Sequence, residues 1–404
     1  MTVLHWTDPE TDTTHAAPWR ALGGGRPPRR VVPADDRISA RVAYRYACEG
    51  TALLWRGDYH GARHLLSALG RRVERALPPA DGFHQHRRNQ AHRARILGML
   101  LVALDADHGL DLRRAPDVRR ACAEAYGPAP GTPGVVPLRE LLGVVGAHEW
   151  RRTGVPVPAL GGDRVHPHYG VFAPVRGEYV DLVGAAPLPR GAVGGVAFDL
   201  GTGTGVLAAV LARRGVGRVV ATDANPRALA CARDNVDRLG LADRVEVSDA
   251  GLWPPAGRAD LVVCNPPWLP ARPVAALDEG VYDPDSRMLR GFLDGLAERL
   301  EPGGGEGWLI LSDLAEHLGL RGRDWLLAAF AAAGLRVADR LDVRPRHPRA
   351  RGGDRGRTDP LSAARAAEVT SLWRLLPVAG STRPMGPMGP MGPMGSTGEG
   401  IVGT

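Results

Sequence analysis

Glycines at alternating positions after a short apolar run constrain this chain more than any other feature. The run Val196–Leu200 is followed by Gly201, Gly203 and Gly205, and a helix-forming stretch begins at Val206. Glycine lets the backbone turn sharply and approach a ligand closely. The pattern therefore predicts a buried strand, a glycine-rich ligand-binding loop and then a helix.

The spacing of these glycines separates two kinds of nucleotide loop. A dinucleotide-binding loop reads G-x-G-x-x-G and would need glycine where this chain has Val206. The chain instead reads D-x-G-x-G-x-G from Asp199. A second predicted strand, Arg218–Asp223, ends in an acid, and Asn225 with the proline after it then begins a helix. We expect Asp223, with Ala224 beside it, to accept hydrogen bonds from both hydroxyls of a ribose.

A second motif, Asn265-Pro266-Pro267-Trp268, directly follows the predicted strand Asp260–Cys264. It is named here the clamp. An amide or aromatic amine is a poor nucleophile because its lone pair is delocalised. Two acceptors, the Asn265 side-chain oxygen and the Pro266 carbonyl, can bind the two N–H groups and direct the lone pair at an electrophile. The prolines fix the backbone, which preorganises the acceptors, and Trp268 offers a flat face for a planar substrate. The alternative is an ordinary surface turn with an aromatic residue.

Together the two motifs resemble those of the class I methyltransferases that use S-adenosyl-L-methionine (SAM), in the small-domain group. That group includes release-factor glutamine methyltransferases and enzymes that act on adenine or guanine amino groups in RNA or DNA. The resemblance covers Val165–Leu376 and implies SAM as cofactor and a Rossmann-like, seven-stranded α/β sheet. The chain departs from the group at Trp268, where tyrosine or phenylalanine is usual, and in its larger N-terminal region.

The resemblance also implies roles for single residues. Asp199 would contact the methionine amino group, Asp249 the adenine edge, and Phe172 would pack over the cofactor from the segment 168–174. The full set expected to bind the cofactor is Phe172, Asp199, Gly201, Thr202, Gly203, Gly205, Asp223, Ala224, Asp249 and Asn265; the catalytic set is Asn265, Pro266, Pro267 and Trp268.

Apolar periodicity predicts how the chain is divided. We expect an irregular N-terminus (1–35), a helical domain that recognises the substrate (36–150), a connecting segment (151–195), the methyltransferase domain (196–378) and a disordered tail (379–404) with four Pro-Met-Gly repeats. In 36–150, apolar residues at helical spacing predict three helices, the third carrying Ile96, Met99 and Leu104. Beyond 196, we place strands near 196–200, 218–223, 244–247, 260–264, 307–312, 335–341 and 369–375, the last two as an antiparallel hairpin.

Composition argues against several classes of enzyme and of metal site. The chain has no lysine among its 51 basic residues, which disfavours P-loop phosphoryl transfer and pyridoxal chemistry. The four cysteines form no C-x-x-C pair, and His84 and His86 lack a nearby third ligand, so we expect no metal. An N-terminus without an apolar segment, and the absence of a membrane-length apolar run, lead us to expect a cytoplasmic protein without membrane contact.

Charge points weakly to an anionic partner. The net charge is +7, and two arginine clusters stand out: His84–Arg95 in the third helix and Arg344–Arg357 between the last two strands. Each can bind phosphates, or each can be a solvated surface. Asp283, Asp285, Ser286 and Arg287 follow the clamp and are expected to contact substrate.

The sequence thus predicts a SAM-dependent N-methyltransferase whose acceptor is a nucleobase in RNA or DNA or a protein glutamine, a translation factor being one such protein partner. Two alternatives stay open. One is a small-molecule N-methyltransferase of a biosynthetic pathway, and the other is a non-catalytic nucleic-acid-binding protein with a vestigial methyltransferase fold. Neither the methylated atom nor the oligomeric state follows from the sequence.

Overall fold

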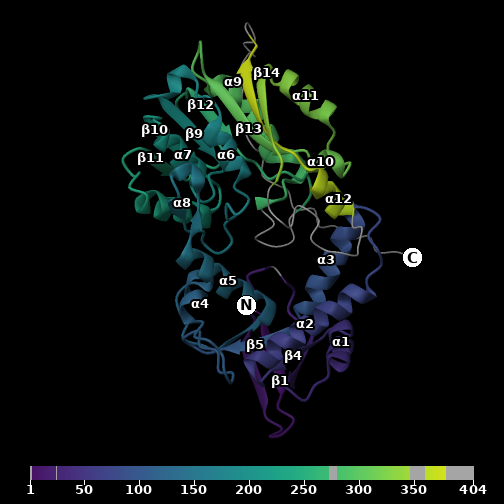
Figure 1. Cartoon of the computed structure of the whole chain (residues 1–404). Coiled ribbons are helices and arrows are strands. Elements are labelled where there is room, and N and C mark those ends of the chain that lie inside the picture. The colour runs from purple at the N-terminus through teal and green to yellow at the C-terminus, as the bar shows by residue number, and fades with distance from the viewer. Residues whose placement is uncertain (1, 24, 273–279, 346–359, 379–404) are drawn as a thin grey trace, which may run out of the picture.

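The computed structural model describes residues 2–23, 25–272, 280–345 and 360–378. They form two α/β units (Figure 1), an N-terminal one that ends with α5 and a C-terminal one built on a seven-stranded sheet. No helix in these ranges is long and apolar enough to cross a membrane.

The C-terminal sheet has the strand order β11-β10-β9-β12-β13-β15-β14. Every neighbouring pair is parallel except those of β15, which runs antiparallel to both β13 and β14. The strands are β9 Val196–Leu200, β10 Arg218–Thr222, β11 Val245–Ser248, β12 Leu261–Cys264, β13 Glu306–Ser312, β14 Leu335–Val343 and β15 Thr370–Pro377. The predicted seven-stranded sheet and its closing antiparallel hairpin are therefore confirmed.

Helices cover both faces of this sheet, because alternate residues of each strand point to opposite sides. Ala197 packs in one apolar cluster with α6 and α7, while Phe198 packs in another with α9 and α11. The helices of this unit are α6 Glu178–Ala185, α7 Val206–Arg213, α8 Pro226–Arg238, α9 Arg287–Arg299, α10 Leu314–His317, α11 Arg323–Ala332 and α12 Pro360–Ala367. The short strands β7 Val155–Pro156 and β8 Arg164–Val165 follow α5 in the chain, before the C-terminal sheet begins. Single 3-10 turns span 158–160, 190–192 and 284–286.

The N-terminal unit is not a helical domain, so that prediction was wrong. It contains a four-stranded sheet of order β3-β4-β5-β6, preceded by the hairpin of β1 and β2 in the part expected to be irregular. Its elements are β1 Val3–Thr7, β2 Thr14–Pro18, β3 Arg30–Ala34, α1 Ala40–Cys48, β4 Thr51–Trp55, α2 Tyr59–Ala76, α3 Phe83–Leu97, β5 Leu100–Leu104, α4 Arg119–Tyr126, β6 Gly134–Pro137 and α5 Leu138–Thr153.

The physical reason for this error lies in burial. All five residues of β4 are buried, so the strand shows no alternation of polar and apolar residues. The third predicted helix is in fact two elements, since α3 ends at Leu97 and β5 begins at Leu100. A continuous apolar run fits a buried helix as well as a buried strand, which is why periodicity failed here.

The two units touch at two places (Figure 1). At one, the Arg227 side chain at the start of α8 donates to the Ala125 carbonyl of α4 at 2.8 Å, and Asp234 of α8 pairs with Arg151 of α5 at 3.4 Å. At the other, α3 contacts α12 and residues that follow β12. A space remains between these two contacts.

Candidate functional site

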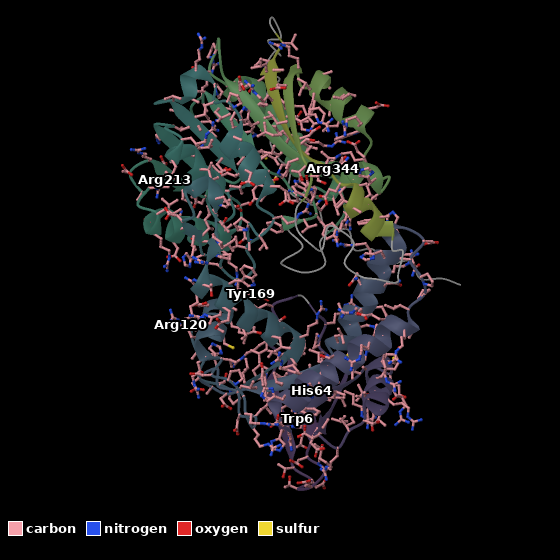
Figure 2. The ribbon with its side chains drawn as sticks, viewed as in Figure 1. Trp6, His64, Arg120, Tyr169, Arg213 and Arg344 are labelled. Atoms are coloured by element: carbon pink, nitrogen blue, oxygen red, sulfur yellow. The ribbon has the colours of Figure 1, made fainter. Side chains whose placement is uncertain are left out.

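A cavity of about 1290 Å³ lies between the two units. Its walls come from the carboxyl ends of β9, β10 and β12, from the segment 169–176, and from Leu22 and Trp150 of the N-terminal unit. Tyr169, at the junction of the units (Figure 2), is one of its lining residues. This volume exceeds the range of about 300–1,000 Å³ that is usual for a site that binds one ligand.

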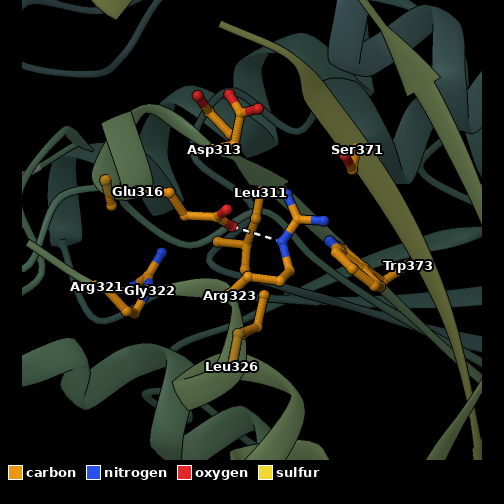
Figure 3. A pocket seen from close by; sticks show the side chains of 11 residues that line it. Leu311, Asp313, Glu316, Arg321, Gly322, Arg323, Leu326, Ser371 and Trp373 are labelled. Atoms are coloured by element: carbon orange, nitrogen blue, oxygen red, sulfur yellow. Dashed lines mark hydrogen bonds and ion pairs between the residues drawn. The ribbon is translucent and has the colours of Figure 1, made fainter. Parts of the chain in front are cut away.

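A second hollow, beside β13 and α11, is unsuitable for a ligand. Its volume is about 10 Å³, room for one water at most. Arg323 donates to Glu316 across it at 2.7 Å (Figure 3). The large cavity is therefore the candidate site.

Gly201, Thr202 and Gly203 of the glycine loop line the cavity. Gly201, Gly203 and Gly205 all have positive φ, at 71°, 56° and 80°. The amides of Gly201 and Thr202 both donate to the carbonyl of Thr222 at 2.9 Å, which ties the loop to the end of β10. Glycine is required because side chains disfavour this conformation.

Asp223 completes the turn between the loop and α8. Its two carboxylate oxygens accept the amides of Gly203 at 3.0 Å and Asn225 at 2.9 Å. Asn225 in turn caps α8 by accepting the amide of Arg227. Each Asp223 oxygen keeps a second acceptor position, and the residue lines the cavity with Ala224.

Asp199 lies beneath the loop, outside the cavity lining. The carboxylate is 1% exposed and accepts the Thr202 hydroxyl at 2.6 Å and the Ala208 amide at 3.0 Å. Burial raises the pKa of this carboxyl to about 6. In this arrangement Asp199 holds the loop against the start of α7, and its expected contact with a methionine amino group stays a prediction.

The clamp residues follow β12 and line the cavity together. The indole N–H of Trp268 donates to the Asn265 side-chain oxygen at 3.0 Å, and Arg321 donates to the Trp268 carbonyl at 3.2 Å. Burial lowers the pKa of Arg321. The Asn265 oxygen keeps one lone pair for a donor in the cavity.

Arg176 is a lining residue that the sequence reasoning missed. Its guanidinium carbon lies 5.5 Å from the centre of the Trp268 ring, and its nitrogens pair with Glu178 at 3.3 Å and with the buried Glu368 at 3.1 Å. The segment 168–174 was selected from the sequence, two residues short of Arg176. The sequence did not indicate that Arg176 lies over Trp268, because the two residues are far apart in the chain and come together only through packing.

The structure brings most, but not all, of the predicted cofactor residues together. Phe172 lines the cavity and is 43% exposed, although it contacts Gly280. Asp249 follows β11 on an exposed turn and does not line the cavity, and neither does Gly205, which packs against Ala232 of α8. The expected contact of Asp249 with an adenine edge stays a prediction.

The residues after the clamp serve the fold. The Asp283 carboxylate accepts the amides of Met288 and Leu289 at the start of α9, and the Ser286 hydroxyl accepts from Arg321. Asp283 and Ser286 are both buried, and none of Asp283, Asp285, Ser286 and Arg287 lines the cavity, so the described structure gives them no substrate contact.

The described members of the two arginine clusters do not line the cavity. In α3, Arg88 bonds to Gln85 within the helix and Arg93 to Glu74 of α2. Of the second cluster, Arg344 is exposed just after β14 (Figure 2), and its other members lie outside the described residues, as does the Pro-Met-Gly tail.

Comparisons with known proteins agree with this geometry. Residues 165–279 match the family model of the methyltransferase small domain. The ribosomal protein L11 methyltransferase of Pelotomaculum thermopropionicum is 40% identical over 149 residues, which cover 36% of this chain and 40% of that protein. The release factor glutamine methyltransferase of Gloeobacter violaceus is 34% identical over 189 residues, covering 45% and 58%.

Among solved structures, a ribosomal protein L11 methylase from Lactobacillus delbrueckii subsp. bulgaricus is 16% identical, with a TM-score of 0.35, and the match covers 54% of this chain and 86% of that one. The chain spans about half the length of the two curated relatives it matches.

Proposed function

Because residues 165–279 form a methyltransferase small domain of the class I SAM-dependent type, we propose that this protein transfers a methyl group to a planar amino group held by Asn265 and Pro266. The observation that carries the proposal is the cavity itself. Residues of the glycine loop, Gly201–Gly203, and of the clamp, Asn265–Trp268, both line it, which supports binding of a cofactor next to an acceptor.

The loop residues suit SAM as a ligand. Asp223 has acceptor positions free for ribose hydroxyls, and the wall is open at Gly203, since a Cβ there would meet nothing within 4 Å. When bound, SAM supplies an electrophilic methyl group on a sulfonium. Thr202 and the three glycines would fix its position through the loop that Asp199 and Thr222 hold in place.

The clamp residues would align the acceptor. The Asn265 oxygen and the Pro266 carbonyl accept the two N–H groups, which turns the nitrogen lone pair toward the methyl carbon. The nitrogen would attack that carbon while the carbon–sulfur bond breaks and the sulfur leaves as a neutral thioether, and the methylated nitrogen would then lose a proton to water. Preorganised acceptors of this kind need no separate strong base, because positioning supplies most of the rate gain.

The cavity lining favours a nucleobase as acceptor. Among the residues that the structure describes, the cations of the lining are Arg176, Arg227 and Arg365, and the acid is Asp223. Trp150, Phe172 and Trp268 add aromatic surface on which a base can stack. A planar amine attached to phosphate fits this combination of aromatic and positive surface.

A protein glutamine is the second candidate. A glutamine amide presents the same planar amino group to the clamp. The name of the Gloeobacter relative refers to that acceptor, and the similarity extends over 45% of this chain.

Labelling with tritiated SAM tests both candidates. We expect the full-length protein to label a fraction of cell extract that nuclease, and not protease, removes. Asn265→Ala should reduce labelling at least about a hundredfold and change SAM affinity little. Label removed by protease would favour the glutamine, label in small molecules would favour a biosynthetic enzyme, and full activity of Asn265→Ala would refute the mechanism.

A further inference from the structure

The segment that follows the clamp is held by a helix of the other unit. Leu269, directly after Trp268, bridges to Tyr282, and its carbonyl accepts the amide of Asp283 at 2.8 Å. Leu269 is buried, and both Leu269 and Tyr282 line the cavity. The two short stretches 268–272 and 280–283, named here the clamp segment, thus contribute Trp268, Leu269 and residues 280–282 to one side of the cavity.

The N-terminal end of α3 packs on this clamp segment with an apolar contact. Phe83, the first residue of α3, is 6% exposed and belongs to one apolar cluster with Leu269, Leu314 and Ala364. Among the described residues, Phe83 is the one buried member of this cluster that comes from the N-terminal unit. A phenylalanine buried to this extent removes most of its ring from water, so the contact stabilises the packing of α3 on the clamp segment.

Arg87, one turn further along α3, adds two polar contacts. Its guanidinium carbon lies 4.1 Å from the centre of the Tyr282 ring, and it donates to the carbonyl of Arg272. A cation this close to an aromatic face is attracted by the ring. Arg87 therefore contacts both stretches of the clamp segment.

The other end of α3 is anchored in its own unit. Ile96 and Leu97 are buried, Ile96 against Ala47 and Val73, and Arg93 pairs with Glu74 at 3.1 Å. A helix of 15 residues spans roughly 22 Å. Helix α3 thus joins the core of the N-terminal unit to the clamp segment as one rigid element.

We propose that α3 holds the clamp segment in its acceptor-binding position, which makes Phe83 and Arg87 positioning residues for methyl transfer. The inference rests on the proposed function for its catalytic part. The N-terminal unit then takes part in catalysis by fixing the clamp, in addition to lining the cavity. A displacement of the clamp by about 1 Å is enough to cost a hundredfold in rate.

Hydrogen exchange and kinetics on the full-length protein test this. The variants are Phe83→Ala, Arg87→Ala and Arg87→Lys, with Arg88→Ala as the matched control, since Arg88 is exposed and bonds to Gln85 within α3. We expect Phe83→Ala and Arg87→Ala to raise amide exchange in 268–272 and 280–283 about tenfold and to leave exchange in 201–206 unchanged. Arg87→Lys should restore part of the protection, and Arg88→Ala should match wild type.

Transfer kinetics use the extract fraction that wild type labels. Phe83→Ala and Arg87→Ala should lower kcat about tenfold or more, with KM for SAM within about twofold. Unchanged exchange in both variants overturns the proposal, and so does raised exchange with a wild-type kcat. If wild type labels no fraction, the proposed function fails, while the exchange arm still decides whether α3 holds the clamp segment.

Discussion

At the scale of single residues, Trp268 has a second role besides offering a flat surface. Its indole N–H donates to the Asn265 oxygen at 3.0 Å, and Arg176 lies over its ring. The bond fixes which way the Asn265 amide faces, because the oxygen must point toward the indole. A phenylalanine at this position would keep an aromatic face and lose that orienting bond.

Trp268→Phe is therefore expected to lower the rate of methyl transfer about three- to tenfold, the equivalent of one hydrogen bond of about 1 kcal/mol. Affinity for SAM, measured by calorimetry, should stay within about twofold. Trp268→Ala, which also removes the stacking surface, should lower the rate further. Equal rates for wild type and Trp268→Phe would show that the indole N–H does not orient Asn265.

The buried carboxyl of Asp199 predicts a pH dependence of stability. Its pKa is raised to about 6 in the folded protein, whereas an unfolded chain titrates near 3.9. The folded state binds the proton more tightly than the unfolded chain does. Protonation of Asp199 therefore adds to the free energy of unfolding at low pH, and this stabilisation is lost as the pH rises through 6. Between pH 5 and pH 7.5, the free energy of unfolding of wild type should therefore fall by about 1 kcal/mol relative to that of Asp199→Asn.

Urea unfolding of the two proteins at both pH values measures this difference. Asparagine can still accept from Thr202 and Ala208 through one oxygen, as the carboxylate oxygen does now. The shape of the site is therefore retained in the variant. A gap in unfolding free energy that does not change with pH would contradict the raised pKa.

At the scale of elements, the glycine loop depends on its backbone conformation. Gly203 has φ of 56° and its amide donates to Asp223, while a Cβ there would meet no atom within 4 Å. A substitution to alanine thus introduces backbone strain of about 1 kcal/mol and no clash. Relaxation of that strain moves the Gly203 amide away from Asp223.

Gly203→Ala is expected to weaken SAM binding about five- to tenfold, as measured by calorimetry. Gly240→Ala is the matched control, since Gly240 has φ of 65°, has open space around it and does not line the cavity. It should cost similar stability and leave SAM affinity unchanged. If both variants lost SAM affinity equally, reduced stability of the whole protein, and not the conformation of the glycine loop, would explain the weaker binding.

At the scale of the whole molecule, two contacts fix the distance between the units. Arg227 carries much of the contact at α8, since it donates to Ala125 and its guanidinium carbon lies 5.7 Å from the centre of the Tyr169 ring. The pair of Asp234 with His168, at 3.0 Å, lies beside it, and burial lowers the pKa of His168. Loss of Arg227 should loosen this junction while α3 still holds the other.

Limited proteolysis checks this expectation. Arg227→Ala should speed cleavage in the connecting stretch 154–165 several-fold, because local opening becomes more frequent. Arg233→Ala is the control, since Arg233 is bonded to the Val247 carbonyl within the C-terminal unit. Equal cleavage rates for the two variants would mean that Arg227 does not hold the units together.

The sequence by itself determined the local elements of the C-terminal unit. The alternating glycines require a positive-φ loop, Asn225 and Pro226 start α8, and the apolar runs give the seven strands. These features depend on backbone preferences and short-range spacing, which are encoded locally. The clamp residues were found for the same reason.

Only the tertiary structure decided what surrounds those motifs. It made β4 and β5 strands, since burial on both faces removes the alternation that marks a strand in sequence. It set Asp199 beneath the loop, brought Arg176 over Trp268, and placed Phe83 against Leu269. These contacts join residues far apart in the chain, and their partners follow from packing of whole elements, which no local pattern records.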